Sequence, residues 1–485
     1  MLKSLRFVLV SFVILMSLPS FCFAQSDSVI ATIPLGGGPT ALVYNPTNNK
    51  IYCANWAWDY VVTIIDGEGD SVIATVEVGD TPYALAYNST NNKIYCANQY
   101  SDNVTIIDGA GDSVITTKGV GAYPKALAYN SIDNKIYCAN EGSDYVSVID
   151  GNNNLAQPPV ELLSFAWDYF FQTALGYNPT DNKIYCGTSH YNFGVPVAGA
   201  VQIINPATDS VIASEFVHNK TTAFAYNPQN NKIYCANFYG SNNFVTIIDG
   251  AGDSAIATVE VDSVPGALAY NDTNNKIYCA NRVSDNVTII DGEGDSVMAT
   301  VGVGDFPMAL AYNPTNNRIY CANQESDNVT IIDGAGDSVI ATVTVGDAPC
   351  ALAYDSTDNK IYCANRNDKT VSVIACSPSS DVEEDQESQA ISNFSLKQNY
   401  PNPFNATTTI RYSTYSARSA HTTLEIYNIL GQKVRTLVDE PKGRGNHEVI
   451  WDGKDEKGKE VASGIYLYRL KVGEFTETKK MLLLK

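Results

Sequence analysis

Histidine is scarce in this chain, with only four among 485 residues. Two of them, His190 and His218, fall in the long central part, and no G-x-S-x-G, H-E-x-x-H or C-x-x-C-H motif occurs. These absences exclude the nucleophile elbow of the α/β-hydrolases, the zinc-protease helix and covalent haem attachment. We therefore expect no catalytic triad, no metal site and no cofactor.

Long hydrophobic runs are also missing after the first residues. Residues 1–24 carry Lys3 and Arg6, an apolar run over 7–18, and a Cys22-Phe23-Ala24 end that suits signal peptidase. A membrane anchor is the alternative, but the run is shorter than the ~20 residues that a spanning helix needs. We predict a cleaved export signal and no transmembrane anchor after cleavage.

Positive charge is the third shortage, since 31 Lys and Arg face 52 Asp and Glu for a net charge of −21. The imbalance is uneven: residues 393–485 carry +5 and residues 1–24 carry +2, which leaves −28 for residues 25–392. A body this acidic repels phosphate backbones and anionic lipids. We expect no nucleic-acid partner.

One short block, N-K/R-I-Y-C, is present eight times. Its cysteines are Cys53, Cys96, Cys138, Cys186, Cys235, Cys279, Cys321 and Cys363, at intervals of 43, 42, 48, 49, 44, 42 and 42 residues. Each interval holds four short runs rich in Val, Ile, Thr and Tyr, typified by ALAY, KIYC, VTII and SVIAT, with Gly, Asn, Asp or Pro between them. A period of this length is typical of one four-stranded propeller blade.

The order of these runs predicts how the ring closes. If ALAY is the innermost strand, the first SVIAT run, over 28–35, precedes any blade, and the last blade lacks its fourth strand after residue 374. We expect the N-terminal run to complete the eighth blade, which leaves no open seam. A linear array is the alternative, but no capping repeat with a polar face is present.

The repeats over residues 28–375 resemble the YVTN family of β-propellers from secreted and surface proteins of bacteria and archaea, with Y-C-A-N in place of the family motif. Propellers of this kind often close with seven blades, so eight is a departure. We predict an all-β fold: an eight-bladed propeller over residues 25–376, an acidic flexible linker over 377–392, and a small Ig-like β-sandwich over 393–485.

The sandwich region resembles the type A C-terminal sorting domain of the type IX secretion system. The resemblance rests on NYPNPFNATTTIRY from Asn399, LEIYNILGQKVRTL from Leu424, WDGKDEKGKEVASGIYLYRL from Trp451 and the ending KKMLLLK. It implies export across the outer membrane, with the secretion machinery as a partner. Lys479, Lys480 and Lys485 are our candidates for the secretion signal, while an ordinary edge strand is the alternative for this segment.

The strand cysteines and the D-G-x-G-D turns both have a structural and a chemical interpretation. Equivalent cysteines of neighbouring blades are related by rotation and lie too far apart for disulfides, which need Cα atoms within ~7 Å, so we expect buried free thiols. The turns, such as residues 66–70 and 291–295, resemble fragments of a calcium loop but lack its remaining ligands. Glycines that permit positive φ explain the turns without an ion.

Aromatic residues gather where the repeats differ from one another, in the loops after Y-C-A-N and after SVIAT. Such loops are a common binding surface, since flat aromatic faces suit sugars and protein partners, although part of the cluster could instead pack an irregular fourth blade. The candidate binding residues are Trp56, Trp58, Tyr60, Tyr100, Trp167, Tyr169, Tyr191, Phe193, Phe238 and Tyr239.

Together these features predict a secreted or cell-surface scaffold without enzymatic activity that binds a protein or a glycan. The alternative is a polysaccharide lyase or hydrolase whose site lies in the propeller channel. A pocket lined by converging carboxylates would favour the enzyme.

Overall fold

The computed structural model describes residues 27–56, 60–163, 169–192, 195–217, 220–239 and 242–377 of the propeller region. In the C-terminal region it describes residues 395–396, 399, 402, 404–414, 420–428, 431–442, 445–472 and 475–484. The predicted export signal and nearly all of the predicted linker lie outside these residues. Among the residues described, no helix has the length and apolar character needed to cross a bilayer. The chain divides into two compact units, Met1–Pro378 and Ser379–Lys485.

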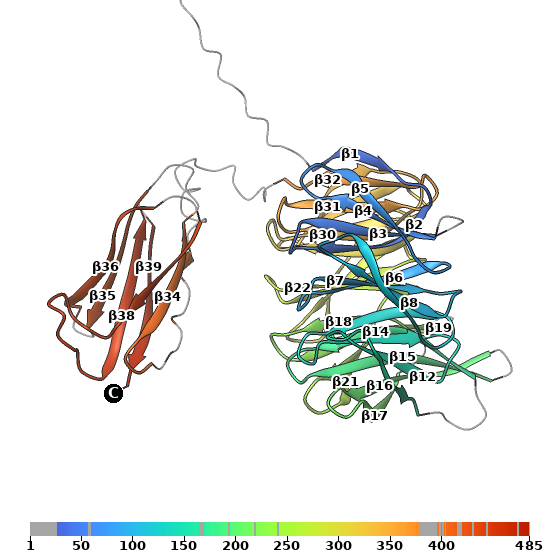
Figure 1. Cartoon of the computed structure of the whole chain (residues 1–485), viewed down its shortest axis with the longest axis horizontal. Helices are drawn as coiled ribbons and strands as arrows, with labels where there is room; N and C mark the ends of the chain where they lie inside the picture. Colours follow the sequence, from blue (N-terminus) through green and yellow to red (C-terminus); the bar gives the residue numbers. More distant parts are fainter. Residues whose placement is uncertain are drawn as a thin grey trace, which may run out of the picture. The chain divides into compact units, whose positions relative to one another are not determined.

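The first unit consists of eight four-stranded antiparallel sheets over its described residues (Figure 1). The innermost strands are β2 (Gly38–Asn45), β6 (Pro82–Asn88), β10 (Pro124–Asn130), β14 (Tyr169–Asn178), β18 (Lys220–Asn227), β22 (Pro265–Asn271), β26 (Pro307–Asn313) and β30 (Pro349–Asp355). The second strands, which hold the Y-C-A-N blocks, are β3 (Lys50–Trp56), β7 (Lys93–Asn98), β11 (Lys135–Asn140), β15 (Lys183–Asn192), β19 (Lys232–Tyr239), β23 (Lys276–Asn281), β27 (Arg318–Asn323) and β31 (Lys360–Asn365).

The outer half of each blade follows the same order. The third strands are β4 (Val61–Asp66), β8 (Asn103–Asp108), β12 (Tyr145–Asp150), β16 (Val195–Asn205), β20 (Asn242–Asp249), β24 (Asn286–Asp291), β28 (Asn328–Asp333) and β32 (Thr370–Ala375). The outermost strands are β5 (Ser71–Glu77), β9 (Ser113–Gly119), β13 (Ala156–Glu161), β17 (Ser210–Val217), β21 (Ser254–Glu260), β25 (Val297–Gly302), β29 (Ser338–Thr344) and β1 (Ser28–Pro34). The predicted strand order within a blade is confirmed.

The ring closes by addition of the N-terminal strand to the last blade, as the sequence predicts. Strand β1 pairs antiparallel with β32, from Ser28 opposite Ala375 to Pro34 opposite Thr370, and the two lie side by side in Figure 1. The inner strands contact their neighbours in ring order, and β30 contacts β2. No blade face is left open at the junction, which excludes the linear array.

Hydrophobic burial between blades explains why these strands pack as a ring. Each second strand is almost entirely buried, and its tyrosine packs with the isoleucine and cysteine of the next blade, as Tyr52 does with Ile94 and Cys96. The third strands are buried to a similar degree, whereas the outermost strands expose much of their surface. The core of the propeller therefore consists of separate clusters, one at each interface between blades.

Two kinds of connection give the propeller two distinct ends. The turns from first to second strand and from third to outer strand lie at one end, which we call the turn face. The loops from second to third strand and from each outer strand to the next inner strand lie at the other end, which we call the loop face. Lys360 Nζ lies 2.9 Å from the carboxylate oxygens of Asp70 at the turn face, so this turn residue joins the last blade to the first.

The D-G-x-G-D turns correct one detail of the sequence-based interpretation. Positive φ occurs at the last aspartate, with 48° at Asp70 and 51° at Asp295, and at none of the glycines of these turns. Gly67 is required for space instead, because a Cβ there would lie 2.6 Å from Oδ1 of Asn49. The aspartate adopts the left-handed conformation that we had assigned to glycine.

The second unit is a sandwich of two antiparallel sheets over its described residues. The three-stranded sheet holds β33 (Ser395–Leu396), β34 (Thr408–Thr414) and β37 (Gly445–Trp451). The four-stranded sheet holds β36 (Lys433–Lys442), β35 (Ala420–Asn428), β38 (Gly464–Val472) and β39 (Phe475–Leu483), in that order. Trp451 is fully buried in its core against Phe404 and Tyr466.

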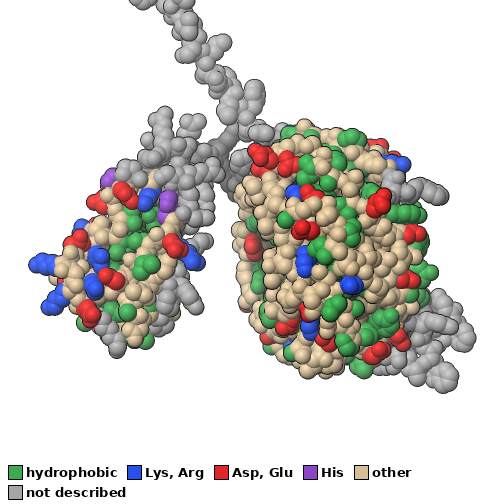
Figure 2. Space-filling model, in the orientation of Figure 1, with side chains coloured by type: hydrophobic (Ala, Val, Ile, Leu, Met, Phe, Trp, Pro, Cys, Tyr) green, Lys and Arg blue, Asp and Glu red, His purple; other side chains and the backbone are tan. Residues whose placement is uncertain are grey.

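The charge of the two units differs in the way the sequence indicates. Figure 2 shows several Lys and Arg side chains on the visible side of the C-terminal unit, while acidic side chains are spread over the visible side of the propeller. Large areas of this visible side of the propeller carry neither charged nor apolar side chains. A cluster of basic residues on this acidic body is therefore a conspicuous feature.

Candidate functional site

A β-bulge near the start of every inner strand positions one side chain at the loop-face end of the channel. The register between inner and second strand shifts at the same place in all eight blades, which leaves one extra residue without a partner across the ladder. The bulged residues are Thr40, Tyr83, Lys125, Thr173, Thr222, Gly266, Met308 and Cys350. Because bulges redirect side chains, this position is suited to present chemistry to a ligand.

Small polar residues at the bulge join neighbouring blades. Thr40 Oγ1 donates to the carbonyl of Pro82 at 2.8 Å, and Thr222 Oγ1 donates to that of Pro265 at 2.7 Å. Cys350 Sγ makes the equivalent contact with the carbonyl of Pro39 at 3.3 Å. Tyrosine, lysine and glycine in the other blades cannot form this contact in the same way, so their presence needs another reason.

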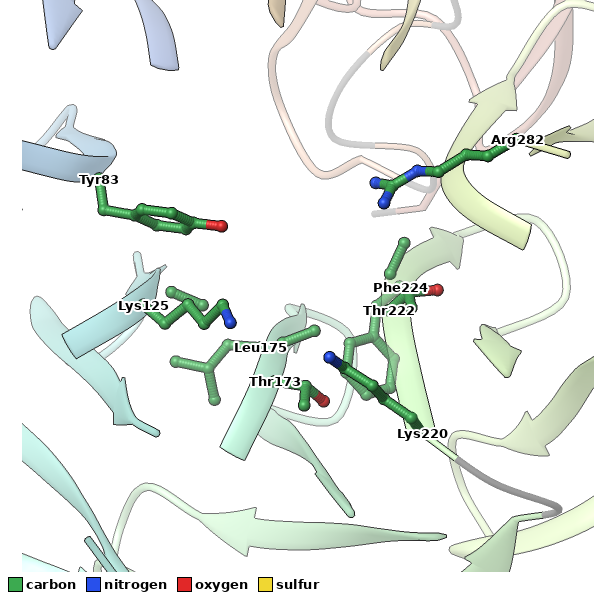
Figure 3. Close-up of a pocket in the computed structure, with 11 residues that line it drawn as sticks. Tyr83, Lys125, Thr173, Leu175, Lys220, Thr222, Phe224 and Arg282 are labelled. Atoms are coloured by element: carbon green, nitrogen blue, oxygen red, sulfur yellow. The ribbon is translucent and has the colours of Figure 1, made fainter. Parts of the chain in front are cut away.

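Four of the bulged residues line one cavity of about 490 Å³ at the loop face. The side chains of Tyr83, Lys125, Lys220 and Arg282 extend toward its open centre (Figure 3). The complete lining is Tyr83, Lys125, Ala126, Thr173, Ala174, Leu175, Lys220, Thr222, Ala223, Phe224 and Arg282. The described lining thus holds three basic side chains and no acidic one, on a propeller that is strongly acidic as a whole.

A glycine makes room for Arg282, which directly follows strand β23. A Cβ on Gly266 would lie 2.0 Å from Nε of Arg282, so the guanidinium occupies the place of a side chain at the bulge. Nη2 of Arg282 donates to the Gly266 carbonyl at 3.3 Å. Nε of Arg282 is buried and has no hydrogen-bond partner among the described residues, so a donor inside the protein is left unused.

Lys125 is partly neutralised by Glu141, which directly follows the second strand β11 of the same blade. Its Nζ lies 2.8 Å from Oε1 of Glu141, and both side chains are about three-quarters buried. The same ammonium lies 5.8 Å from the ring centre of Tyr83, within the range of a cation–π contact. Lys125 is therefore held in place by Glu141 and Tyr83 while it faces the cavity.

Lys220 carries the least compensated charge of the cavity. It is the first residue of β18, and its Nζ has no hydrogen-bond or ion-pair partner among the described residues. Burial holds the pKa of Lys220 below its usual value, and the positive charges of Lys125 and Arg282 lower it further, against an opposing effect of Glu141. Burial likewise lowers the pKa of Arg282. The three cations thus repel one another in a partly desolvated space.

The predicted aromatic binding residues do not line this cavity where their side chains are described. Trp56, Tyr60 and Tyr100 are exposed, and Phe238 is half-buried in β19. Tyr100 makes an edge-to-face contact with Tyr123, with ring centres 6.0 Å apart. Tyr60 and Tyr100 lie in loops after the second strands, whereas Trp56 ends β3 and Phe238 lies within β19, and the role of all four in binding stays a prediction.

The remaining candidates fall wholly or partly outside the described residues. Tyr169 and Tyr191 are opposite each other in the paired strands β14 and β15, and Tyr239 ends β19, but their side chains are not described. Trp58, Trp167 and Phe193 lie outside the described residues, and so does Lys485 of the proposed secretion signal. Their contribution to a site stays a prediction.

The aromatic candidates drawn from the sequence do not include the basic residues of the cavity. The necessary signal is present in the repeats: Lys125 stands where other blades have Thr40 or Thr173, and Arg282 stands where they have Gln99 or Gln324. What cannot be read from the repeats is that a bulge aims Lys125 into the channel and that Gly266 accommodates Arg282. Both facts depend on the three-dimensional register.

The surroundings of the strand cysteines indicate a packing role. All eight are fully buried, and the ten cysteines among the described residues are free thiols. Burial raises the pKa of each strand thiol well above its usual value, so they are neutral at physiological pH. Within the described part of the chain, no three His, Cys, Asp or Glu residues are grouped so that they could hold a metal ion.

The secretion-signal candidates lie in an edge strand. β39 is at the end of its sheet, and Met481 and Leu483 are buried while Leu484 is exposed. Lys479 Nζ pairs with Oε1 of Glu477 at 3.3 Å, and Lys480 is exposed. The strand therefore combines a core-facing side with an accessible basic side.

Comparison with known families supports the two folds. The model of the FlgD Ig-like domain matches residues 400–474, and that of the seven-bladed β-propeller lactonases matches residues 214–338. Each covers less than half of the chain, and the propeller has eight sheets rather than seven. No curated protein matches the chain.

Solved structures with a similar fold include two propellers. Hydrazine synthase of Kuenenia stuttgartiensis superposes with a TM-score of 0.51 at 21% identity, over 62% of this chain and 96% of that one. The Dos1 propeller superposes with a TM-score of 0.60 at 12% identity, over 72% of this chain and 95% of that one. At these identities the likeness shows the propeller fold alone.

Proposed function

We propose that this chain is an exported, non-enzymatic binding protein that holds a ligand in the loop-face cavity of its propeller. The observation that carries the proposal is the cavity itself, in which Tyr83 and Lys125 replace the blade-joining residue found at the bulge of other repeats. A rigid ring whose loops vary mainly at one end is well suited to present a binding site. The candidate ligands are a surface glycan or a protein.

The export part of the proposal rests on the two ends of the sequence. Residues 1–24 have the pattern of a signal peptide, and the repeats resemble the YVTN family of secreted and surface propellers. The C-terminal blocks resemble the type A sorting domain of the type IX secretion system, and a seven-stranded sandwich is compatible with that resemblance. The secretion machinery would then be a partner, and the secreted or surface-bound form would be the functional one.

The lack of catalytic groups in the cavity supports a binding role. A glycoside hydrolase requires two carboxyl groups on either side of the bond that it cleaves, and the described lining contains none. Glu141, the acid nearest to Lys125, is held in an ion pair.

A lyase is the second candidate, because Tyr83 and three cations share the cavity. Cations that stabilise a carboxylate can make the neighbouring C–H bond acidic enough for a base to remove its proton. Incubation of the protein with polygalacturonate would separate the two candidates. An increase in the ultraviolet absorbance of unsaturated chain ends would establish the lyase, whereas intact polymer is expected for a binding protein.

Two experiments test the proposed function. A glycan and protein array probed with the purified full chain should give specific hits, and a complete lack of hits would refute the binding role. Deletion of residues 393–485 should leave a folded propeller trapped in the periplasm, since the sandwich has its own core. Surface delivery of the truncated protein would refute the role of the sandwich in export.

A further inference from the structure

The distribution of basic residues over the propeller is the first step toward the chemistry of its ligand. Residues 25–376 contain fourteen Lys and Arg, and eight of these are the basic residues of the N-K/R-I-Y-C blocks at the turn face. Seven of those eight are ion-paired, for example Lys50 with Asp112 at 2.6 Å. Of the other six, three line the loop-face cavity. Half of the basic residues that the blade architecture does not use are thus gathered at one place.

The donors in this cluster are incompletely used within the protein. Within the described part of the chain, Nε of Arg282 is buried without a hydrogen-bond partner, and no hydrogen bond or ion pair is formed by Nζ of Lys220. A buried donor without a partner costs about 1–3 kcal/mol, and more for a charged group. The arrangement therefore destabilises the free protein, and an external acceptor would remove that cost.

Other parts of the cavity prepare it for such an acceptor. Gly266 leaves the space that Arg282 fills, and the bulge directs Lys125 to the same centre. Figure 3 shows the amino groups of Lys125 and Lys220 and the guanidinium of Arg282 around one open space. Glu141 is the one acid among the described residues that forms an ion pair with them, so three positive charges face one negative charge there.

We propose that the loop-face cavity is an anion-binding site, in which Lys220 and Arg282 bind a carboxylate, sulfate or phosphate group of a small acidic ligand or of an acidic chain end. This inference rests on the proposed binding function and specifies its ligand class. Lys125 is held in place by its ion pair with Glu141 and adds to the positive electrostatic potential of the cavity. A concave, partly dry site strengthens these charges relative to bulk water.

The remaining lining fits the uncharged part of such a ligand. A volume of about 490 Å³ lies within the range of about 300–1,000 Å³ that is typical of small-molecule sites. Tyr83 is 38% exposed and contributes a ring and a hydroxyl group, while Leu175 and Phe224 contribute apolar surface. An acidic sugar satisfies both requirements, because its ring can contact Tyr83 while its charged group reaches the cations.

Calorimetric titration of the purified full chain with three probes tests the inference. Citrate carries charge without a sugar ring, digalacturonate carries both, and cellobiose is a neutral disaccharide. We expect citrate and digalacturonate to bind with an affinity that falls as salt is added, and cellobiose not to bind. Tighter binding of digalacturonate than of citrate would identify acidic sugars as the source, and the reverse would identify small carboxylates.

Three substitutions locate the site. Lys220→Gln and Arg282→Gln should each weaken the binding of the anions by about tenfold or more, as expected for a lost hydrogen bond between charged groups. Gly266→Ala keeps all charges but displaces the guanidinium of Arg282, and should weaken binding in the same way. Lys118→Gln is the matched control, because it removes the same charge from the outer strand β9, away from the cavity.

The outcomes distinguish the ligand class from the binding function. The inference is overturned if neither anion binds, or if Lys118→Gln weakens binding as much as Lys220→Gln does. If a neutral ligand from the array binds the wild type and Lys220→Gln equally well, the acidic class is wrong while the binding function stands. Circular dichroism of each variant ensures that a loss of binding is not a loss of folding.

Discussion

Nη1 of Arg318 donates a hydrogen bond of 2.8 Å to Oδ2 of Asp27, and only 5% and 2% of the two side chains are exposed. The pair joins the start of the N-terminal strand to the seventh blade, and Ser377 Oγ donates to the other oxygen of Asp27 at 2.8 Å. For five of the other seven basic residues of these blocks, the last aspartate of a D-G-x-G-D turn plays the same role. The segment before β1 thus replaces a turn that the last blade lacks.

Loss of this carboxylate should destabilise the closed ring strongly. Asp27→Asn leaves Arg318 buried without its counter-charge, a change that typically lowers the free energy of unfolding by about 3–5 kcal/mol. Asp112→Asn breaks the equivalent ion pair with Lys50. The side chains of Lys50 and Asp112 are 14% and 20% exposed, so this change should lower the free energy of unfolding by less. Urea denaturation of both variants makes the comparison, and equal stability of the two would contradict the role of Asp27 in closure.

One missing hydrogen bond in the fourth blade should be easy to restore. In six blades the tyrosine of the inner strand bonds to a threonine in the preceding blade's turn, for example Tyr129 to Thr90 at 2.5 Å. For Tyr177 of the fourth blade, the equivalent turn residue is Ile132 instead of a threonine. The hydroxyl group of Tyr177 is buried without a hydrogen-bond partner among the described residues. Ile132 is 58% exposed, so little apolar burial is lost when it is replaced.

Ile132→Thr is therefore expected to raise the free energy of unfolding by about 0.5–1.5 kcal/mol, the usual net value of one hydrogen bond. The reverse change in the neighbouring blade, Thr90→Ile, should lower it by a similar amount, because it leaves the Tyr129 hydroxyl unsatisfied. Thermal unfolding measures both. A destabilised Ile132→Thr protein would mean that Tyr177 cannot reach the new hydroxyl.

The ring of asparagines at the turn face is interrupted at a single position. Seven inner strands end in an asparagine that donates to an asparagine of the next blade at 2.7–2.9 Å, as Asn45 does to Asn92. The eighth strand ends in Asp355, which is fully buried and has one oxygen without a partner among the described residues. A carboxylate has no hydrogen to donate to Asn49, the residue that follows in the ring.

Asp355→Asn supplies the missing donor and removes a buried charge that is only half satisfied. We expect it to raise the free energy of unfolding by about 1–3 kcal/mol, the cost of an unsatisfied buried polar group. Asn313→Asp, the opposite change in the preceding blade, should be destabilising. Lower stability of Asp355→Asn would show that the carboxylate has a partner of its own at the junction between last and first blades.

The sequence was sufficient for the architecture because the blade is repeated eight times. The spacing of Cys53 and its equivalents established the blade, and the unpaired run before Thr40 led to the way in which the ring closes. Each inference used a pattern that recurs in eight repeats, so an irregularity in one repeat did not change the result. The turn residues were less predictable, since Asp70 and not Gly67 has the positive φ.

The cavity could not be predicted in the same way, because it depends on departures from the repeat. Lys125 and Arg282 are visible as departures, but their convergence with Lys220 requires the bulge register and the ring geometry. The exposed aromatic residues Trp56 and Tyr100 also differ from the equivalent residues of other repeats. The sequence alone does not show whether the aromatic or the basic residues form the binding site. Only the position of a side chain relative to the channel distinguishes them.

The buried thiols should resist chemical modification in the folded protein. Burial raises the pKa of the strand cysteines far above the usual value of about 8.5, so thiolate is scarce even in mildly alkaline buffer. Desolvation by burial is also the main cause that raises the pKa of Cys376 to about 11. Ellman's reagent at pH 8 should therefore react with none of them at first, and with all after denaturation.

Cys350 and Cys376 retain 7% and 9% exposure, so they should be the first to react when the folded protein is incubated for hours. Raising the pH from 8 to 9 should accelerate the reaction of Cys376 more than that of a free thiol, because the thiolate fraction rises almost tenfold at a pKa of about 11 and only about threefold at a pKa of about 8.5. Rapid labelling of more than two cysteines in the native state would contradict the burial of the second strands.

The pH dependence of stability provides a last test of the cation cluster. Because the pKa of Lys220 is lower in the folded protein than its usual value of about 10.4, the unfolded chain binds its proton more tightly. Stability therefore rises with pH as the solution passes from below the folded pKa to above the unfolded one. The full penalty is present below the folded pKa and disappears above the unfolded one.

Lys220→Gln should thus unfold at a higher temperature than the wild type at pH 7. The difference between the two unfolding temperatures should shrink as the pH approaches the usual lysine pKa of about 10.4. Adding citrate should stabilise the wild type more than the variant, since a bound anion compensates the charge of Lys220. Lys118→Gln serves as the control for a general effect of net charge. A gap between wild type and Lys220→Gln that does not change with pH or citrate would show that repulsion among Lys125, Lys220 and Arg282 does not govern this end of the channel.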